Sequence, residues 1–138
     1  MLAPPIPKPF AKPVVKVLMV ENPEHLQIVE LKLQKQLEGQ LSVMRSKPFF
    51  LEFTEAGVTK GTSLNKLIQK LGIKREEVIA MGDSYNDQAM IEFAGLGVAM
   101  GNAIDELKSV SKYQTLTNEQ DGIGVFLEEY LKIKVKTV

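Results

Sequence analysis

A short apolar run that leads through a polar loop into a helical pattern constrains the fold more than any other feature of this sequence. Residues 78–81 read Val-Ile-Ala-Met, residues 82–87 read Gly-Asp-Ser-Tyr-Asn-Asp, and apolar residues then recur at helical spacing over 90–94. A strand that ends in a polar loop and opens a helix is the repeating unit of open α/β sheets. Ligands of such sheets bind beyond the carboxyl ends of the strands, beside helix N-termini. We therefore expect a ligand site at residues 82–87.

The chain from residue 60 onward alternates between predicted helices and short apolar strands. Glycine 72 is expected to end the first of these helices, and Asn102 is a plausible N-cap for a later one. The alternation predicts parallel βα units in a doubly wound sheet. The predicted elements are a helix up to residue 71, strands over 78–82, 97–100 and 113–116, and helices over 87–94, 104–110 and 125–131.

Residues 14–53 predict a different unit, a small sheet that carries one helix. A β-branched run predicts a strand over 14–20, and Asn22 followed by Pro23 is typical of a helix start. Two further strands are expected over 41–46 and 49–53, with Lys47 and Pro48 between them. The order is β-α-β-β. Residues 1–13 hold five of the seven prolines and are expected to form an extended leader.

Composition gives no support to several classes of function and indicates none. The 17 Lys and Arg residues balance the 17 Asp and Glu residues, so the chain offers no basic surface for nucleic acid. No run approaches the length of a membrane span. The absence of cysteine rules out disulfides and thiolate metal sites, and it makes the reducing cytoplasm the simplest location. The single histidine, His25, is expected to be a surface residue.

Four polar residues are candidates for binding a phosphate or a cation, and each has a plain structural alternative. Asp83 and Asp87 are spaced so that both could face one pocket, or Asp83 caps the turn and Asp87 favours the helix N-terminus. Lys60 is either a phosphate-binding cation near a helix start or a solvated surface charge. Asn86 either donates its amide to a phosphate oxygen or serves as the N-cap of the helix that follows. The residues alone leave these alternatives open.

Three blocks of this sequence resemble the later motifs of the haloacid dehalogenase superfamily, specifically its Cof-like sugar-phosphatase branch. The blocks are residues 58–62, 78–87 and 97–103, and residues 14–53 resemble the closing portion of that branch's cap domain. The resemblance implies an α/β fold, the C-terminal half of a doubly wound, Rossmann-like core preceded by a partial α+β cap domain. It divides the chain into the leader 1–13, the partial cap 14–54 and the core portion 55–138.

The resemblance also implies a role for each candidate residue. Lys60 and Asn86 would bind the substrate phosphate. Asp83 would be a Mg²⁺ ligand, and Asp87 would be an acid that holds the binding residues in place without contacting the substrate or the metal. The implied function is part of a Mg²⁺-dependent phosphatase for small phosphorylated metabolites such as sugar phosphates. In that mechanism an aspartate attacks phosphorus and forms an aspartyl-phosphate, which water hydrolyses while a second aspartate acts as acid and base.

The sequence departs from the family at the nucleophile. The family carries it in a DxD motif, whereas this chain has four aspartates, of which no two are separated by one residue. We therefore expect the chain to be inactive alone, as a fragment, a half that needs a partner chain or a self-associating remnant. The alternative is a non-catalytic remnant or interaction module that binds phosphate or divalent ions weakly. In the resembled fold the missing strand lies beside residues 78–82, so we expect an exposed strand edge through which the chain associates with itself or a partner.

Overall fold

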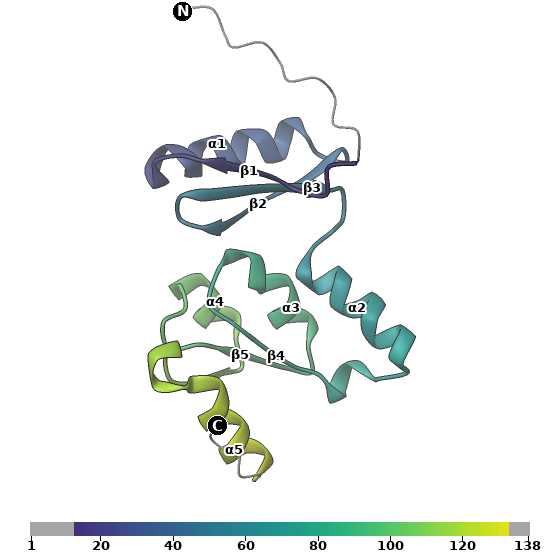
Figure 1. The fold of residues 1–138 in the computed structure, drawn as a ribbon, viewed down its shortest axis with the longest axis vertical. Helices are drawn as coiled ribbons and strands as arrows, with labels where there is room; N and C mark the ends of the chain where they lie inside the picture. The colour runs from purple at the N-terminus through teal and green to yellow at the C-terminus, as the bar shows by residue number, and fades with distance from the viewer. Residues whose placement is uncertain (1–12, 133–138) are drawn as a thin grey trace, which may run out of the picture.

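The computed structural model describes residues 13–132, which form two three-stranded sheets with helices packed on them. Figure 1 shows the first sheet and its helix stacked above the second sheet and its helices. This arrangement confirms the predicted α/β class, with the β-α-β-β order in the first unit, whose sheet is antiparallel, and parallel βα units after it. Whether the units are separate domains stays a prediction. The predicted leader lies outside the described residues except for Pro13.

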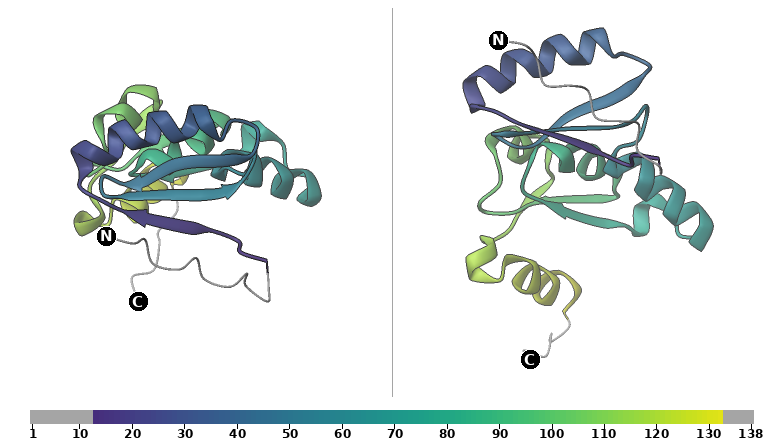
Figure 2. Two further views of the ribbon diagram at one scale, coloured as in Figure 1. Left: turned by 90° about the horizontal axis from the view of Figure 1, so that it is seen from above. Right: turned by 45° about the horizontal axis from the view of Figure 1, so that its top comes forward.

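The first sheet is antiparallel and has the strand order β1-β3-β2. Helix α1 covers one of its faces, as both views of Figure 2 show, and buries Leu26 against Val43 and Leu51. Asn22 is the N-cap of α1, because its side chain accepts a hydrogen bond from the Glu24 N–H. The elements are β1 (Val17–Val20), α1 (Pro23–Gln36), β2 (Leu41–Lys47) and β3 (Phe50–Glu55).

The second sheet is parallel and has the strand order β4-β5-β6. Alternate residues of β5 face opposite sides: Ala99 packs with α3 and α4, whereas Val98 packs with Phe126 of α5. Helices therefore cover both faces, as in a doubly wound fold. The elements are α2 (Lys60–Leu71), β4 (Ile79–Gly82), α3 (Gln88–Phe93), β5 (Leu96–Ala99), α4 (Asp105–Val110), β6 (Tyr113–Gln114) and α5 (Gly122–Leu131).

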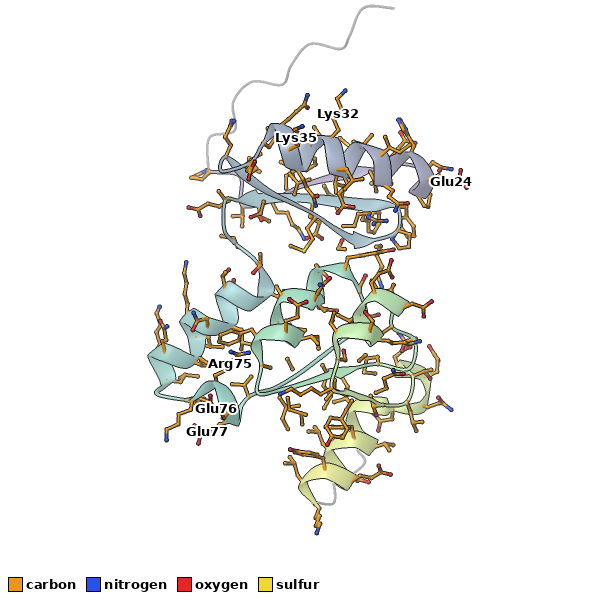
Figure 3. The ribbon with its side chains drawn as sticks, turned by 180° about the vertical axis from the view of Figure 1, so that it is seen from behind. Glu24, Lys32, Lys35, Arg75, Glu76 and Glu77 are labelled. Atoms are coloured by element: carbon orange, nitrogen blue, oxygen red, sulfur yellow. The ribbon has the colours of Figure 1, made fainter. Side chains whose placement is uncertain are left out.

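Three single-turn helices and one arginine fix the connections of the second unit. The turns are η1 (Arg75–Glu77), η2 (Tyr85–Asp87) and η3 (Asn118–Gln120). Gly72 ends α2 in the left-handed conformation, as predicted. Arg75, labelled in Figure 3, donates to the carbonyls of Glu92 and Phe93 at the end of α3. The turn before β4 is thereby fixed against the helix that follows the site loop.

Some predicted boundaries were wrong. The first strand begins at Val17 rather than at residue 14, because its register against β3 starts with the Val17–Phe53 pair. The strand predicted over 113–116 is regular only at Tyr113–Gln114, although the next two residues still bond to the backbone of Ala99 and Gly101. Asn102 is not the N-cap of α4, a position that Ile104 holds instead. The Asn102 side chain is used elsewhere, as described below.

Candidate active site

The loop that follows β4 brings two aspartates of different character to the same end of the sheet. Asp83 follows the last residue of β4, and Asp87 ends η2, directly before α3. Asp83 and Asp87 both line a cavity of about 340 Å³ at the carboxyl ends of β4 and β5, together with Lys60 and Asn102. The side chain of Asp83 is 40% exposed, whereas that of Asp87 is 5% exposed. One carboxylate thus faces the cavity and the other is enclosed by the loop.

Asp87 is buried because the strand end leaves room for it and the loop satisfies its charge. A Cβ on Gly82 would lie 2.5 Å from that of Asp87, so only glycine allows this approach. Oδ2 of Asp87 accepts hydrogen bonds from the backbone N–H groups of Asp83, at 2.9 Å, and Ser84, at 3.1 Å. Oδ1 pairs with the ammonium of Lys60. The carboxylate that holds the turn together is therefore that of Asp87, not that of Asp83.

Lys60 is held at the first position of α2 by the capping of that helix. Thr59 is the N-cap, and its side chain and that of Thr62 exchange hydrogen bonds with each other's backbone N–H groups. The next residue, Gly61, is buried against the backbone of Ala89 in α3, so the two helices approach closely at this point. Lys60 is 47% exposed at the side chain. It therefore reaches Asp87 with one face of its ammonium and leaves the other toward the cavity.

Asp83 is held more loosely and keeps an oxygen available. Its backbone carbonyl accepts from the Ile104 N–H at 3.1 Å, and Oδ2 accepts from Nδ2 of Asn102 at 3.3 Å. Oδ1 of Asn102 in turn accepts from the Asn118 N–H at 2.9 Å. Within residues 13–132, Oδ1 of Asp83 makes no hydrogen bond. Asn102 thus links Asp83 to η3, a contact that reading it as a helix cap missed.

Asn86 lies on a neighbouring cavity rather than beside Asp83. It is inside η2, and Ser84 precedes that turn, so the alternative that Asn86 is the N-cap of α3 is wrong. The neighbouring cavity has a volume of about 410 Å³ and is lined by Asn86, Lys60, Ser63 and Met44 among others. Lys60 borders both cavities. In the described part of the chain the Asn86 amide has no hydrogen-bond partner, so it is available to a ligand.

The residues at this cavity fit a Mg²⁺ ion that takes one ligand from the protein, the carboxylate of Asp83. Mg²⁺ keeps several waters and is bound through one or two carboxylates together with substrate phosphate oxygens. Asp83 has a free carboxylate oxygen at the cavity, whereas both oxygens of Asp87 are engaged. Over residues 13–132 no cluster of three or more His, Asp or Glu side chains forms a complete cage. A Mg²⁺ ion at this cavity would thus have Asp83 as its one carboxylate ligand from residues 13–132, and other groups would complete the coordination.

Two further observations bear on the predicted classes of function. His25 lies on α1, is 64% exposed and is 3.9 Å from Glu21, so it does not belong to either cavity. No helix in the span 13–132 combines the length and the apolar character needed to cross a bilayer.

Known families and proteins match most of this chain. A family model described as haloacid dehalogenase-like hydrolase matches residues 6–127. The Bacillus subtilis enzyme YcsE, a 5-amino-6-(5-phospho-D-ribitylamino)uracil phosphatase, is 44% identical over 102 residues, which are 74% of this chain and 39% of YcsE. YitU of the same organism has the same activity in its name and is 46% identical over 83 residues, which are 60% of this chain and 31% of YitU.

Solved structures of haloacid dehalogenase-like proteins also match this chain over most of its length. A haloacid dehalogenase-like hydrolase from Bacteroides thetaiotaomicron is 46% identical with a TM-score of 0.71, and the match covers 88% of this chain and 46% of that protein. The subclass IIB sugar phosphatase BT4131 is 28% identical with a TM-score of 0.75, over 88% of this chain and 45% of its own. The chain spans less than half the length of the curated relatives it matches.

Proposed function

Because the chain belongs to the haloacid dehalogenase-like hydrolase family, we propose that it forms the C-terminal half of a Mg²⁺-dependent phosphatase site for small phosphorylated metabolites such as sugar phosphates. The observation that carries this proposal is the pairing of Lys60 with the buried Asp87, beside the open carboxylate of Asp83. This arrangement presents one cation and one partly exposed carboxylate to a single cavity at the carboxyl ends of parallel strands. The proposed location is the cytoplasm.

We assign each residue a role in binding a phosphate monoester. Lys60 binds a phosphate oxygen, and Asp87 holds its ammonium in place. Asn86 donates its free amide to another oxygen of the same group, from the cavity that shares Lys60. Asp83 supplies the protein ligand for Mg²⁺, which when bound would neutralise charge on the transferring phosphoryl group. The proposed partner is thus a small phosphorylated metabolite, and the first sheet, as the proposed partial cap, covers this side of the site.

The proposed activity belongs to a complete site rather than to this chain alone. Attack on phosphorus requires a nucleophile, and neither Asp83 nor Asp87 is suited to that task. Asp87 is enclosed by its three partners, and Asp83 is assigned to the metal. The sequence has no pair of aspartates separated by one residue to supply the nucleophile and the acid–base group. We therefore propose that the chain by itself does not turn over substrate.

A chimera of this chain with the N-terminal half of a relative tests this function. The N-terminal half of YcsE, joined to this chain at residue 14, would supply the absent strand. We expect the chimera to hydrolyse p-nitrophenyl phosphate with Mg²⁺ and the unjoined chain not to do so. Lys60→Ala or Asp83→Ala should lower kcat/KM of the chimera by about 100-fold or more, because each removes a charge that stabilises the transition state. Lys32→Ala, at an exposed site on α1, is the matched control.

Two outcomes would overturn the proposal in different ways. Turnover by the unjoined chain that Asp83→Ala abolishes would contradict the claim that the chain is inactive alone. A chimera that circular dichroism shows to be folded but that has no activity would instead favour the non-catalytic alternative, a remnant that binds phosphate or divalent ions weakly.

A further inference from the structure

The end of β2 lies directly on the loop of the candidate site. The carbonyl of Ser46 accepts a hydrogen bond from Oγ of Ser84 at 2.7 Å. The guanidinium carbon of Arg45 lies 4.2 Å from the ring centroid of Tyr85. Arg45 is itself held by Glu30 of α1: Nε of Arg45 donates to Oε2 of Glu30 at 2.6 Å. Ser84 is 5% exposed, so this contact excludes solvent. The first sheet is therefore attached to the loop that carries Asp83.

Lys47, the residue after Ser46 and the last of β2, reaches the carboxylate of Asp83. Its Nζ lies 3.8 Å from Oδ2 of Asp83, and the two side chains are 53% and 40% exposed. The β2–β3 register shifts between Arg45 and Lys47, and Pro48 follows immediately. Such an irregularity changes the direction of the side chains beyond it. Lys47 lies beyond this irregularity, still paired with Phe50, and its Nζ is directed to the Asp83 carboxylate.

Lys47 is the cation paired with Asp83 in the described part of the chain. The ammonium of Lys60 is paired with Asp87, and the other partner of the Asp83 side chain is the neutral amide of Asn102. A divalent cation bound to Asp83 would therefore meet an ammonium that is already close to one of the two carboxylate oxygens. Like charges at such a separation repel, although solvent weakens the effect at this half-exposed position.

We propose that Lys47 competes with a divalent cation for Asp83. In this arrangement the ammonium pairs with Oδ2 of Asp83 when no cation is bound and repels a divalent cation that binds the free Oδ1. The backbone contact between Ser46 and Ser84 does not depend on that charge, so the segment stays attached while the lysine side chain moves. Lys47 then sets the cation affinity of the site from the first sheet. The inference rests on the proposed function only in taking Asp83 as the cation ligand.

Titration of the 138-residue chain with Mn²⁺, followed by electron paramagnetic resonance of the free ion, tests the competition. We expect Lys47→Met to tighten binding by about two- to fivefold, the effect of removing one partly solvated like charge. Lys47→Arg keeps the charge and should bind as the original chain does. Lys32→Met removes the same charge from the outer side of α1, where Figure 3 labels Lys32, and controls for net charge. Adding Asp83→Asn to Lys47→Met should abolish the tighter Mn²⁺ binding.

The outcomes separate this inference from the proposed function. Equal or weaker Mn²⁺ binding by Lys47→Met, or a gain that Lys32→Met reproduces, overturns the competition. Absence of binding in both the original chain and Lys47→Met also overturns it, because Asp83 is then no cation ligand even without the ammonium. An active chimera together with no gain in Lys47→Met would sink the inference alone. A gain together with an inactive chimera would sink only the phosphatase proposal.

Discussion

At the scale of single residues, the site divides its two aspartates between holding the loop and facing the cavity. Asp87 is enclosed by a lysine and two backbone N–H groups, so its charge serves to fix the positions of Lys60 and of residues 83 and 84. Asp83 has a partly exposed carboxylate with one free oxygen. A buried carboxylate with all its partners in place is costly to disturb, whereas a half-exposed one is not.

This difference predicts the stability of two variants. Asp87→Ala should lower the free energy of unfolding by about 2–4 kcal/mol, because it leaves two N–H groups and an ammonium without their acceptor. Asp83→Ala should cost less than about 1 kcal/mol. Urea unfolding followed by circular dichroism measures both, with the exposed Asp105→Ala as control. Equal costs for Asp83→Ala and Asp87→Ala would contradict the division of roles.

The sequence indicated part of this site and concealed the rest for a physical reason. The motif spacing pointed to Lys60, Asp83, Asn86 and Asp87, and three of these four line one cavity. Asn102 was misread because a helix follows it closely, which is the local signature of a cap. Its actual partners, Asp83 and the backbone of Asn118, are 19 and 16 residues away. Contacts at such separations leave no local pattern, and the same is true of Lys47.

At the scale of elements, the site depends on how closely two helices approach. α2 carries Lys60 and α3 follows Asp87, and the helices meet where Gly61 lies on the backbone of Ala89. Element types were predictable because strand and helix periodicities differ. Strand ends were less so: residues 14–16 read as strand, yet pairing with β3 begins only at Val17. Pairing depends on the partner strand, which local propensity does not specify.

The close approach of α2 and α3 predicts the effect of a single added methyl group. Gly61→Ala should destabilise the chain by about 1–3 kcal/mol, because the new Cβ would overlap the carbonyl of Ala89 and force the helices apart. Ser63→Ala, at an exposed position of the same helix, should be neutral or slightly stabilising. Thermal unfolding of the two variants compares them. A Gly61→Ala chain as stable as Ser63→Ala would mean that the helices do not meet there.

At the scale of the whole molecule, β4 forms one edge of the second sheet, and this edge strand carries no polar side chain. In the strand order β4-β5-β6, β4 is paired on one side only within residues 13–132. The carbonyls of Val78 and Gly82 accept from Leu96 and Met100 on the β5 side. By the alternation of a strand, Ile79 and Met81 direct their N–H and C=O groups to the open side. This edge lies beside the loop of the candidate site, so whatever pairs with β4 adjoins that loop.

An open apolar edge of this kind predicts association of the isolated chain. Unpaired edge strands recruit further strands, and four residues without charge offer nothing to oppose this. We expect sedimentation velocity to show species heavier than 15.3 kDa that increase with concentration, and hydrogen exchange to show protection of the Ile79 and Met81 amides. Met81→Pro removes an outward N–H and should shift the chain toward monomer. Ala80→Pro, on the β5 side, should instead destabilise the sheet. A wild-type chain that stays monomeric at every concentration, with both amides exchanging rapidly, would show that the edge needs no partner.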